Sequence, residues 1–80
     1  MTLEIISPEG LLFKGEVSEV AFPGTSGAFE ILQDHAPFIS SLKAGVIRFK
    51  AGGEQKEQAI KGGLVEVKDK HLSVCVESSK

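Results

Sequence analysis

Residues 24–49 read GTSGAFEILQDHAPFISSLKAGVIRF, and they carry the most informative pattern of the chain. It joins a glycine-rich turn to a short apolar strand, which is followed by an Asp34-His35-Ala36-Pro37 loop. A second apolar run, a break at Gly45 and a third strand complete it. Short apolar segments that are separated by turn residues every eight to twelve positions or so are typical of an all-β sandwich or barrel.

The same pattern extends over the whole chain. We expect strands at residues 3–6, 11–22, 28–32, 38–42, 46–50, 58–61, 64–68 and 71–76. The segment 11–22 changes the parity of its apolar positions, which indicates a bulge or bend, and Gly15 is the expected place. Ala51–Glu54 and Asp69-Lys70 are interpreted as tight hairpin tips. The prediction is one domain over residues 1–80: an all-β, flattened two-sheet sandwich of roughly eight to ten short, mostly antiparallel strands.

The bulk composition excludes several classes of protein. Charged residues make up 25% of the chain and hydrophobic residues 41%, which is a globular balance rather than a disordered one. The net charge is −2 and the nine basic residues form no run, so nucleic-acid binding is poorly supported. No apolar run approaches the roughly 20 residues that span a bilayer. The single cysteine and the absence of a signal-peptide pattern favour a cytoplasmic, bacterial protein.

Few side chains suit catalysis or metal binding. On a strand, His71 and Cys75 would lie roughly 13 Å apart at about 3.3 Å per residue, too far for a thiol–imidazole pair. Between Val74 and Val76, Cys75 is expected in or beside the core. The pair Asp34-His35 lacks the further converging ligands that a metal site needs. The sequence therefore predicts no catalytic residue, no metal and no cofactor.

The glycine clusters at residues 24–27 and 62–63 do not form a phosphate-binding loop. No helix follows either cluster and no Gly-Lys-Ser/Thr is present, whereas phosphate loops use a helix N-terminus. We interpret these glycines as turn residues that adopt positive φ.

Four short motifs occur in a distinctive order and spacing. They are Ser7-Pro8-Glu9-Gly10 with Phe13-Lys14-Gly15, the 24–49 stretch, GGLVEV at 62–67 and Leu72-Ser73-Val74. In these motifs the chain resembles the N-terminal β domain of the epsilon subunit of F-type ATP synthase, over essentially all of its length. The resemblance implies a non-catalytic rotor subunit of the central stalk. Such a subunit links gamma to the membrane c-ring and couples ion translocation to ATP synthesis.

The resemblance also implies two contact surfaces. In the family, the loop that matches His35, Ala36 and Pro37 lies against the gamma subunit, and Ser40 is nearby. A local role for His35, in capping loop amides or packing on Phe38, remains the alternative.

The predicted c-ring interface is the next turn upstream, which comprises Ser26, Gly27, Ala28, Phe29 and Glu30. Some relatives have an acidic residue where Ala28 stands, and most have glycine where Glu30 stands. A carboxylate contact displaced by two residues would keep its strand face. The alternative is that Glu30 is simply a solvated strand charge.

The family further implies gamma and the c-ring as partners, with alpha and beta reached indirectly through the complex. It places the protein peripherally on the cytoplasmic side of the bacterial inner membrane. Most members continue into a C-terminal helical hairpin. Because this sequence stops after its last strand, we expect a short form without the hairpin, its braking of hydrolysis or its ATP site.

A lipoyl or biotinyl carrier domain is the competing hypothesis. Such domains are also small and all-β, and they display one modified lysine at a hairpin tip, a position that Lys70 could fill. Two features oppose it: Lys70 lies near the C-terminal end rather than the middle, and its neighbours lack the carrier pattern. A polar hairpin turn is the simpler interpretation.

Overall fold

The computed structural model of the protein describes residues 1–32 and 36–78, and it contains strands but no helix in that part of the chain. The eight strands are β1 (Thr2–Ser7), β2 (Gly10–Glu16), β3 (Glu19–Phe22), β4 (Phe29–Ile31), β5 (Phe38–Leu42), β6 (Gly45–Ala51), β7 (Glu54–Lys68) and β8 (His71–Ser78). The predicted all-β class and strand number are confirmed. Accordingly, no helix among these residues could cross a membrane.

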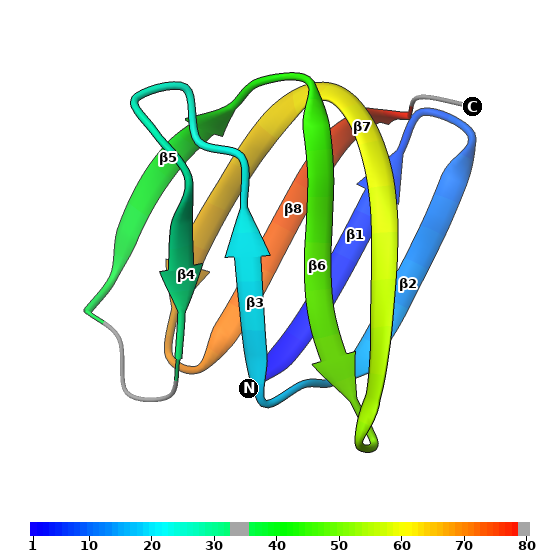
Figure 1. Ribbon diagram of the computed structural model, residues 1–80, viewed down its shortest axis with the longest axis vertical. Helices are drawn as coiled ribbons and strands as arrows, with labels where there is room; N and C mark the ends of the chain where they lie inside the picture. Colours follow the sequence, from blue (N-terminus) through cyan, green and yellow to red (C-terminus); the bar gives the residue numbers. More distant parts are fainter. Residues whose placement is uncertain (33–35, 79–80) are drawn as a thin grey trace.

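The strands form two layers that share β7. The first half of β7 pairs with β6, β6 pairs with β3, and β3 pairs with β4. The second half of β7 pairs with β5 on one side and with β8 on the other. Next to β8 come β1 and then β2. Figure 1 shows β3 and β6 crossing in front of β8 and β1, with β4 in front of the second half of β7. All pairs are antiparallel except β1 with β8, so the predicted sandwich is confirmed with both layers joined through one bent strand.

The core lies between the layers and follows from strand alternation. In β8, for example, Leu72, Val74 and Val76 are buried while the residues between them are exposed. Side chains on alternate positions face opposite sides of a strand, so each strand contributes only every second residue to the interior. The buried set is Leu3, Ile5, Val17, Val20, Phe22, Ile31, Leu42, Ile47, Phe49, Ile60, Val65, Val67, Leu72, Val74 and Val76.

One predicted break does not exist, because β7 runs continuously through Gly62 and Gly63. Neither glycine has a positive φ, so the interpretation of both as turn residues is wrong. The reason for glycine is close approach: a Cβ on Gly63 would lie 2.5 Å from the Cys75 carbonyl oxygen of β8. A strand glycine of this kind lets a neighbouring backbone come near.

The predicted strand at 11–22 is divided, and its bend is not at Gly15. The chain leaves β2 at Glu16 and enters β3 at Glu19, so it changes layer around Val17 and Ser18. The bulge is at Leu12: Ile5 faces Phe13 while Ile6 faces Leu11, which leaves Leu12 as the extra residue. The change of parity in residues 11–22 thus correctly indicated an irregularity, but the irregularity is not at Gly15.

Both predicted hairpin tips are confirmed. Gly52 and Gly53 have φ of 59° and 79°, and Asp69 and Lys70 have φ of 51° and 62°. Two consecutive residues with positive φ form the type I′ turn, whose twist matches that of the flanking strands. Lys70 is therefore at a hairpin tip in a conformation that ordinarily suits glycine.

Candidate partner-binding surfaces

The turn between β3 and β4 presents most of the predicted c-ring residues to solvent. Pro23 and Gly24 are buried, and the Gly27 amide donates to the Gly24 carbonyl at 3.0 Å, which closes the turn. Beyond this anchor, Ser26, Gly27, Ala28 and Glu30 are exposed. The structure thus brings four of the five predicted residues together on an accessible turn and edge strand.

Phe29 differs from its neighbours because it points inward. It is half-buried, and its ring centroid lies 5.4 Å from that of Phe22 and 5.7 Å from that of Phe38. Tilted and edge-on ring pairs at such distances are favourable contacts. Phe29 therefore anchors the turn to the core instead of offering its ring to a partner.

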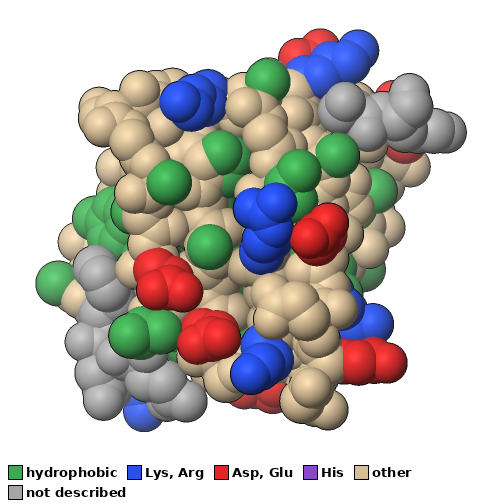
Figure 2. Space-filling model, in the orientation of Figure 1, with side chains coloured by type: hydrophobic (Ala, Val, Ile, Leu, Met, Phe, Trp, Pro, Cys, Tyr) green, Lys and Arg blue, Asp and Glu red, His purple; other side chains and the backbone are tan. Residues whose placement is uncertain are grey.

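Glu30 lies on the outer face of the first layer, which carries mixed charges. It faces Ala21 of β3, which in turn faces Arg48 of β6. Arg48 forms an ion pair with Glu57 at 3.2 Å, whereas Glu30 forms none with any residue that the structure describes. Figure 2 shows acidic, basic and small apolar side chains interspersed over this face. The Glu30 carboxylate is thus available to a partner.

The second predicted surface is only partly described. His35 lies outside the described residues, so its role stays a prediction. Ala36 and Pro37 are exposed, while Ser40 is half-buried and its hydroxyl donates to the Ser41 carbonyl at 3.2 Å. Ser40 shares its parity with the buried Leu42 and so points toward the interior.

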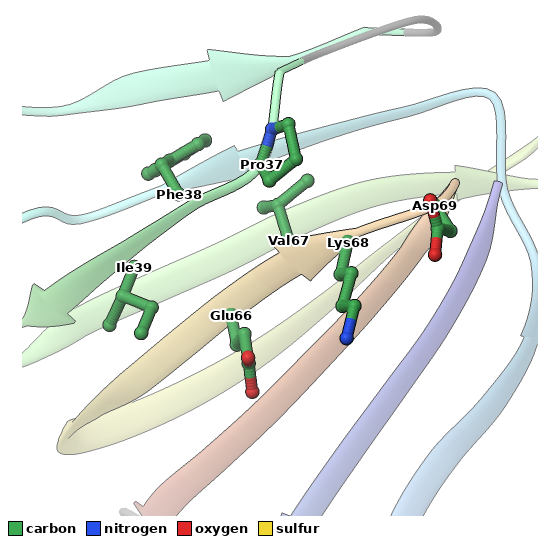
Figure 3. A pocket seen from close by; sticks show the side chains of 7 residues that line it. All are labelled: Pro37, Phe38, Ile39, Glu66, Val67, Lys68 and Asp69. Carbon is green, nitrogen blue, oxygen red and sulfur yellow. The ribbon is translucent and has the colours of Figure 1, made fainter.

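A hollow of about 430 Å³ lies beside Pro37. It is formed where the start of β5 passes the end of β7, as Figure 3 shows, and it is lined by Pro37, Phe38, Ile39, Glu66, Val67, Lys68 and Asp69. Ile39 faces Glu66 across the strand pair, and its side chain is 63% exposed. The hollow is therefore open to solvent with an apolar wall on the β5 side.

Sequence reasoning missed an apolar row on the outer face of the second layer. Strand register aligns one residue from each of four neighbouring strands: Leu64 of β7, Cys75 of β8, Ile6 of β1 and Leu11 of β2. All four are exposed. Exposed apolar patches of this kind mark protein interaction sites. We call these four residues the apolar row.

The expectation that Cys75 lies in or beside the core is wrong. Cys75 is exposed, because it shares its parity with Ser73 and Glu77 on the outer face of β8. That face also carries the exposed His71. Among residues 1–32 and 36–78, no group of three or more histidine, cysteine, aspartate and glutamate side chains could hold a metal ion.

The clearest electrostatic perturbation is at the start of the chain, away from both surfaces. The Thr2 hydroxyl donates to Glu16 at 2.7 Å, and the N-terminal ammonium group lies 3.4 Å from the other carboxylate oxygen. The Thr2 hydrogen bond, followed by the ammonium group, lowers the pKa of Glu16. These two contacts hold the end of β2 against the start of β1.

Comparison with known proteins shows the family. The β-sandwich domain of the ATP synthase delta/epsilon chain matches residues 1–80. This chain belongs to that family. It is 39% identical over 77 residues to the ATP synthase epsilon chain of Leptospira borgpetersenii serovar Hardjo-bovis (strain JB197), with 96% of this chain and 61% of the relative covered. The epsilon chain of Desulfitobacterium hafniense (strain DSM 10664 / DCB-2) is 40% identical over 79 residues, with 99% and 60% covered.

The chain thus spans about three-fifths of the length of these relatives. Solved structures agree on the fold of this ATP synthase domain. A structure of the central stalk and c-ring of Tetrahymena thermophila mitochondrial ATP synthase matches with a TM-score of 0.84 at 16% identity, covering 98% of this chain and 63% of that one. A Euglena gracilis mitochondrial ATP synthase chain gives the same TM-score at 21% identity, covering 92% and 48%.

Family membership bears on the carrier hypothesis as well. The structure puts Lys70 at a hairpin tip, which both interpretations require. The tip alone therefore does not discriminate between them. The match of the whole chain to the ATP synthase family favours a polar hairpin turn.

Proposed function

We propose that this domain is a non-catalytic part of the rotor of an F-type ATP synthase. In this role it binds the gamma subunit and rests on the c-ring, so that ion translocation is coupled to ATP synthesis. It reaches alpha and beta only through the complex, and it is held peripherally at the cytoplasmic side of the bacterial inner membrane. The observation that carries the proposal is the match of all 80 residues to the epsilon-type β-sandwich.

The second layer supplies the surface proposed for gamma. Pro37 and Ile39 border the hollow, and the apolar row begins on the neighbouring strand β7, at Leu64. Leu64 and Ile6 in that row are 47% and 39% exposed. A partner that covered this face would remove contiguous apolar surface from water, which is the main source of affinity at protein interfaces.

The first layer supplies the surface proposed for the c-ring. Its exposed residues Ser26, Gly27, Ala28 and Glu30 occupy one turn and one edge strand, and Phe29 holds them to the core. A free carboxylate at Glu30 suits a basic or hydroxyl-bearing loop of the partner. The two surfaces belong to different layers, which suits a domain that separates two partners.

Titration of purified gamma with the chain tests the gamma surface. Leu64→Asp and Ile6→Asp place a charge in the apolar row, and each should weaken binding by about tenfold or more, roughly 1.4 kcal/mol. Gln55→Asp adds the same charge at an exposed position of β7 in the first layer, so it is the control and should change affinity little. Wild-type affinity in both row variants would contradict this surface.

Reconstituted membranes test the c-ring surface. With Glu30→Lys, ATP-driven ion pumping should fall while ATP hydrolysis by the soluble part of the complex stays unchanged. Glu57→Lys, on the same face but in β7, is the control. Full pumping with Glu30→Lys would remove this residue from the contact.

A further inference from the structure

The segment Pro23–Thr25 lies outside the named strands, yet it pairs with β5. The Thr25 amide donates to the Ser41 carbonyl at 3.1 Å, and the Lys43 amide donates to the Pro23 carbonyl at 2.8 Å. Between these bonds, Gly24 forms a bridge with Leu42. The side chains add a further link, because the Thr25 and Ser41 hydroxyl oxygens are 2.7 Å apart. We call Pro23–Thr25 with its β5 partners the clasp.

The clasp ties the chain that follows β3 to β5. Among the strands that the structure describes, β4 has three residues and pairs only with β3, and β5 pairs only with β7. They belong to different layers, and Figure 1 shows the turn after β3 reaching over toward β5. The clasp therefore closes the open side of the sandwich at the point where the Ser26–Glu30 turn leaves the body of the domain.

Packing beneath the clasp leaves it little freedom. A Cβ on Gly24 would lie 2.6 Å from the Gly27 carbonyl oxygen and 2.8 Å from the Phe29 ring. A Cβ on Gly45 would lie 2.9 Å from Pro23. Contacts this short do not occur without displacement, so the turn and the Phe29 ring are seated directly on the clasp.

We infer that Thr25 and Ser41 are positioning residues, whose hydroxyl pair fixes the Ser26–Glu30 turn to β5 so that a load on the turn passes to the second layer. The inference rests on the proposed function, since it assumes that the turn and the second layer contact different partners. Without the hydroxyl pair, the turn would depend on backbone bonds that are exposed at a sheet edge. Neither hydroxyl would touch a partner.

The test uses the assembled ATP synthase with Thr25→Val, Ser41→Ala, the double variant and Thr25→Ser. Exchange of the Thr25 amide should become roughly two- to tenfold faster in the two single variants, as expected for one lost hydrogen bond. The ratio of ions pumped to ATP hydrolysed should fall in both, and the double variant should be no worse than either single one. Thr25→Ser keeps the hydroxyl and should restore the ratio.

Gamma affinity should stay unchanged in Thr25→Val and Thr25→Ser, because Thr25 lies outside the surface proposed for gamma. Ser18→Ala, at an exposed position between β2 and β3, is the control for loss of an exposed hydroxyl. Faster exchange with undiminished pumping would overturn the inference, and so would additive effects in the double variant. Failure of Glu30→Lys to affect pumping would instead count against the proposed c-ring surface. The two failures are thus distinguishable.

Discussion

Phe13 of β2 and Phe49 of β6 contact each other across the two layers, with ring centroids 4.6 Å apart and planes tilted by 53°. Phe49 is only 3% exposed. Phe49→Ala should lower the free energy of unfolding by about 3–5 kcal/mol, because it removes the buried ring and leaves a cavity. Urea denaturation measures the change. Lys50→Ala, the outward neighbour, should change it by less than about 0.5 kcal/mol, and a similar small effect at Phe49 would contradict the packing.

Gly63 offers a sharper test of the close approach of β7 and β8. Gly63→Ala should destabilise the fold by about 1–3 kcal/mol, since the new methyl would displace the β8 backbone at Cys75. Gly62→Ala is the matched control, because its Cβ would meet only the Leu42 carbonyl oxygen at 3.5 Å, an ordinary contact. Denaturation curves and amide shifts along β8 measure both. Equal effects at the two glycines would refute the steric explanation.

Lys70 carries backbone strain that can be relieved. Its φ of 62° is unfavourable for a residue with a Cβ, whereas Asp69 tolerates a similar φ more readily. Lys70→Gly should raise the free energy of unfolding by about 0.5–1 kcal/mol, the strain relieved less the entropy that glycine gains when unfolded. Asp69→Gly should gain less. A thermal unfolding midpoint that falls in Lys70→Gly would disprove the strain.

The fold class was predictable because strand alternation and turn chemistry are local. The Gly52-Gly53 and Asp69-Lys70 tips are encoded by adjacent residues, so both were predicted correctly. The continuity of β7 was not predictable, since glycines at 62 and 63 suit either a turn or a close crossing. The β8 backbone opposite Gly63 decides between a turn and a close crossing, and only folding brings that backbone next to the glycine.

The candidate surfaces also differ in how far the sequence predicts them. The turn before β4 was predictable from its adjacent residues, and the family resemblance made residues 26–30 a candidate surface, but neither indicated the inward direction of Phe29. The apolar row was not, because its members come from four strands and only register aligns them. The apolar neighbours Val74 and Val76 favour burial of Cys75, but strand alternation places it outward with Ser73 and Glu77, and alternation decides.

Glu16 should make stability depend on pH. Its folded pKa is lowered below the ordinary value of 4.5 by the Thr2 hydroxyl and then the N-terminal ammonium group. A carboxyl group with a depressed folded pKa stabilises the fold above its unfolded pKa, and this contribution is lost as pH falls through the folded pKa. Glu16→Gln should therefore be less stable than the wild type at pH 7. The difference should shrink as pH falls below 4.5.

Denaturation of both proteins at pH 7 and at steps below 4.5 measures this difference. Thr2→Val removes the larger cause, so an NMR titration of this variant should find the pKa of Glu16 nearer its ordinary value. Glu66→Gln, at an exposed position on β7, controls for the change in net charge. A Glu16→Gln deficit that stays constant across the whole pH range would assign the effect to side-chain shape, because a charge contribution must disappear once the carboxyl group is protonated.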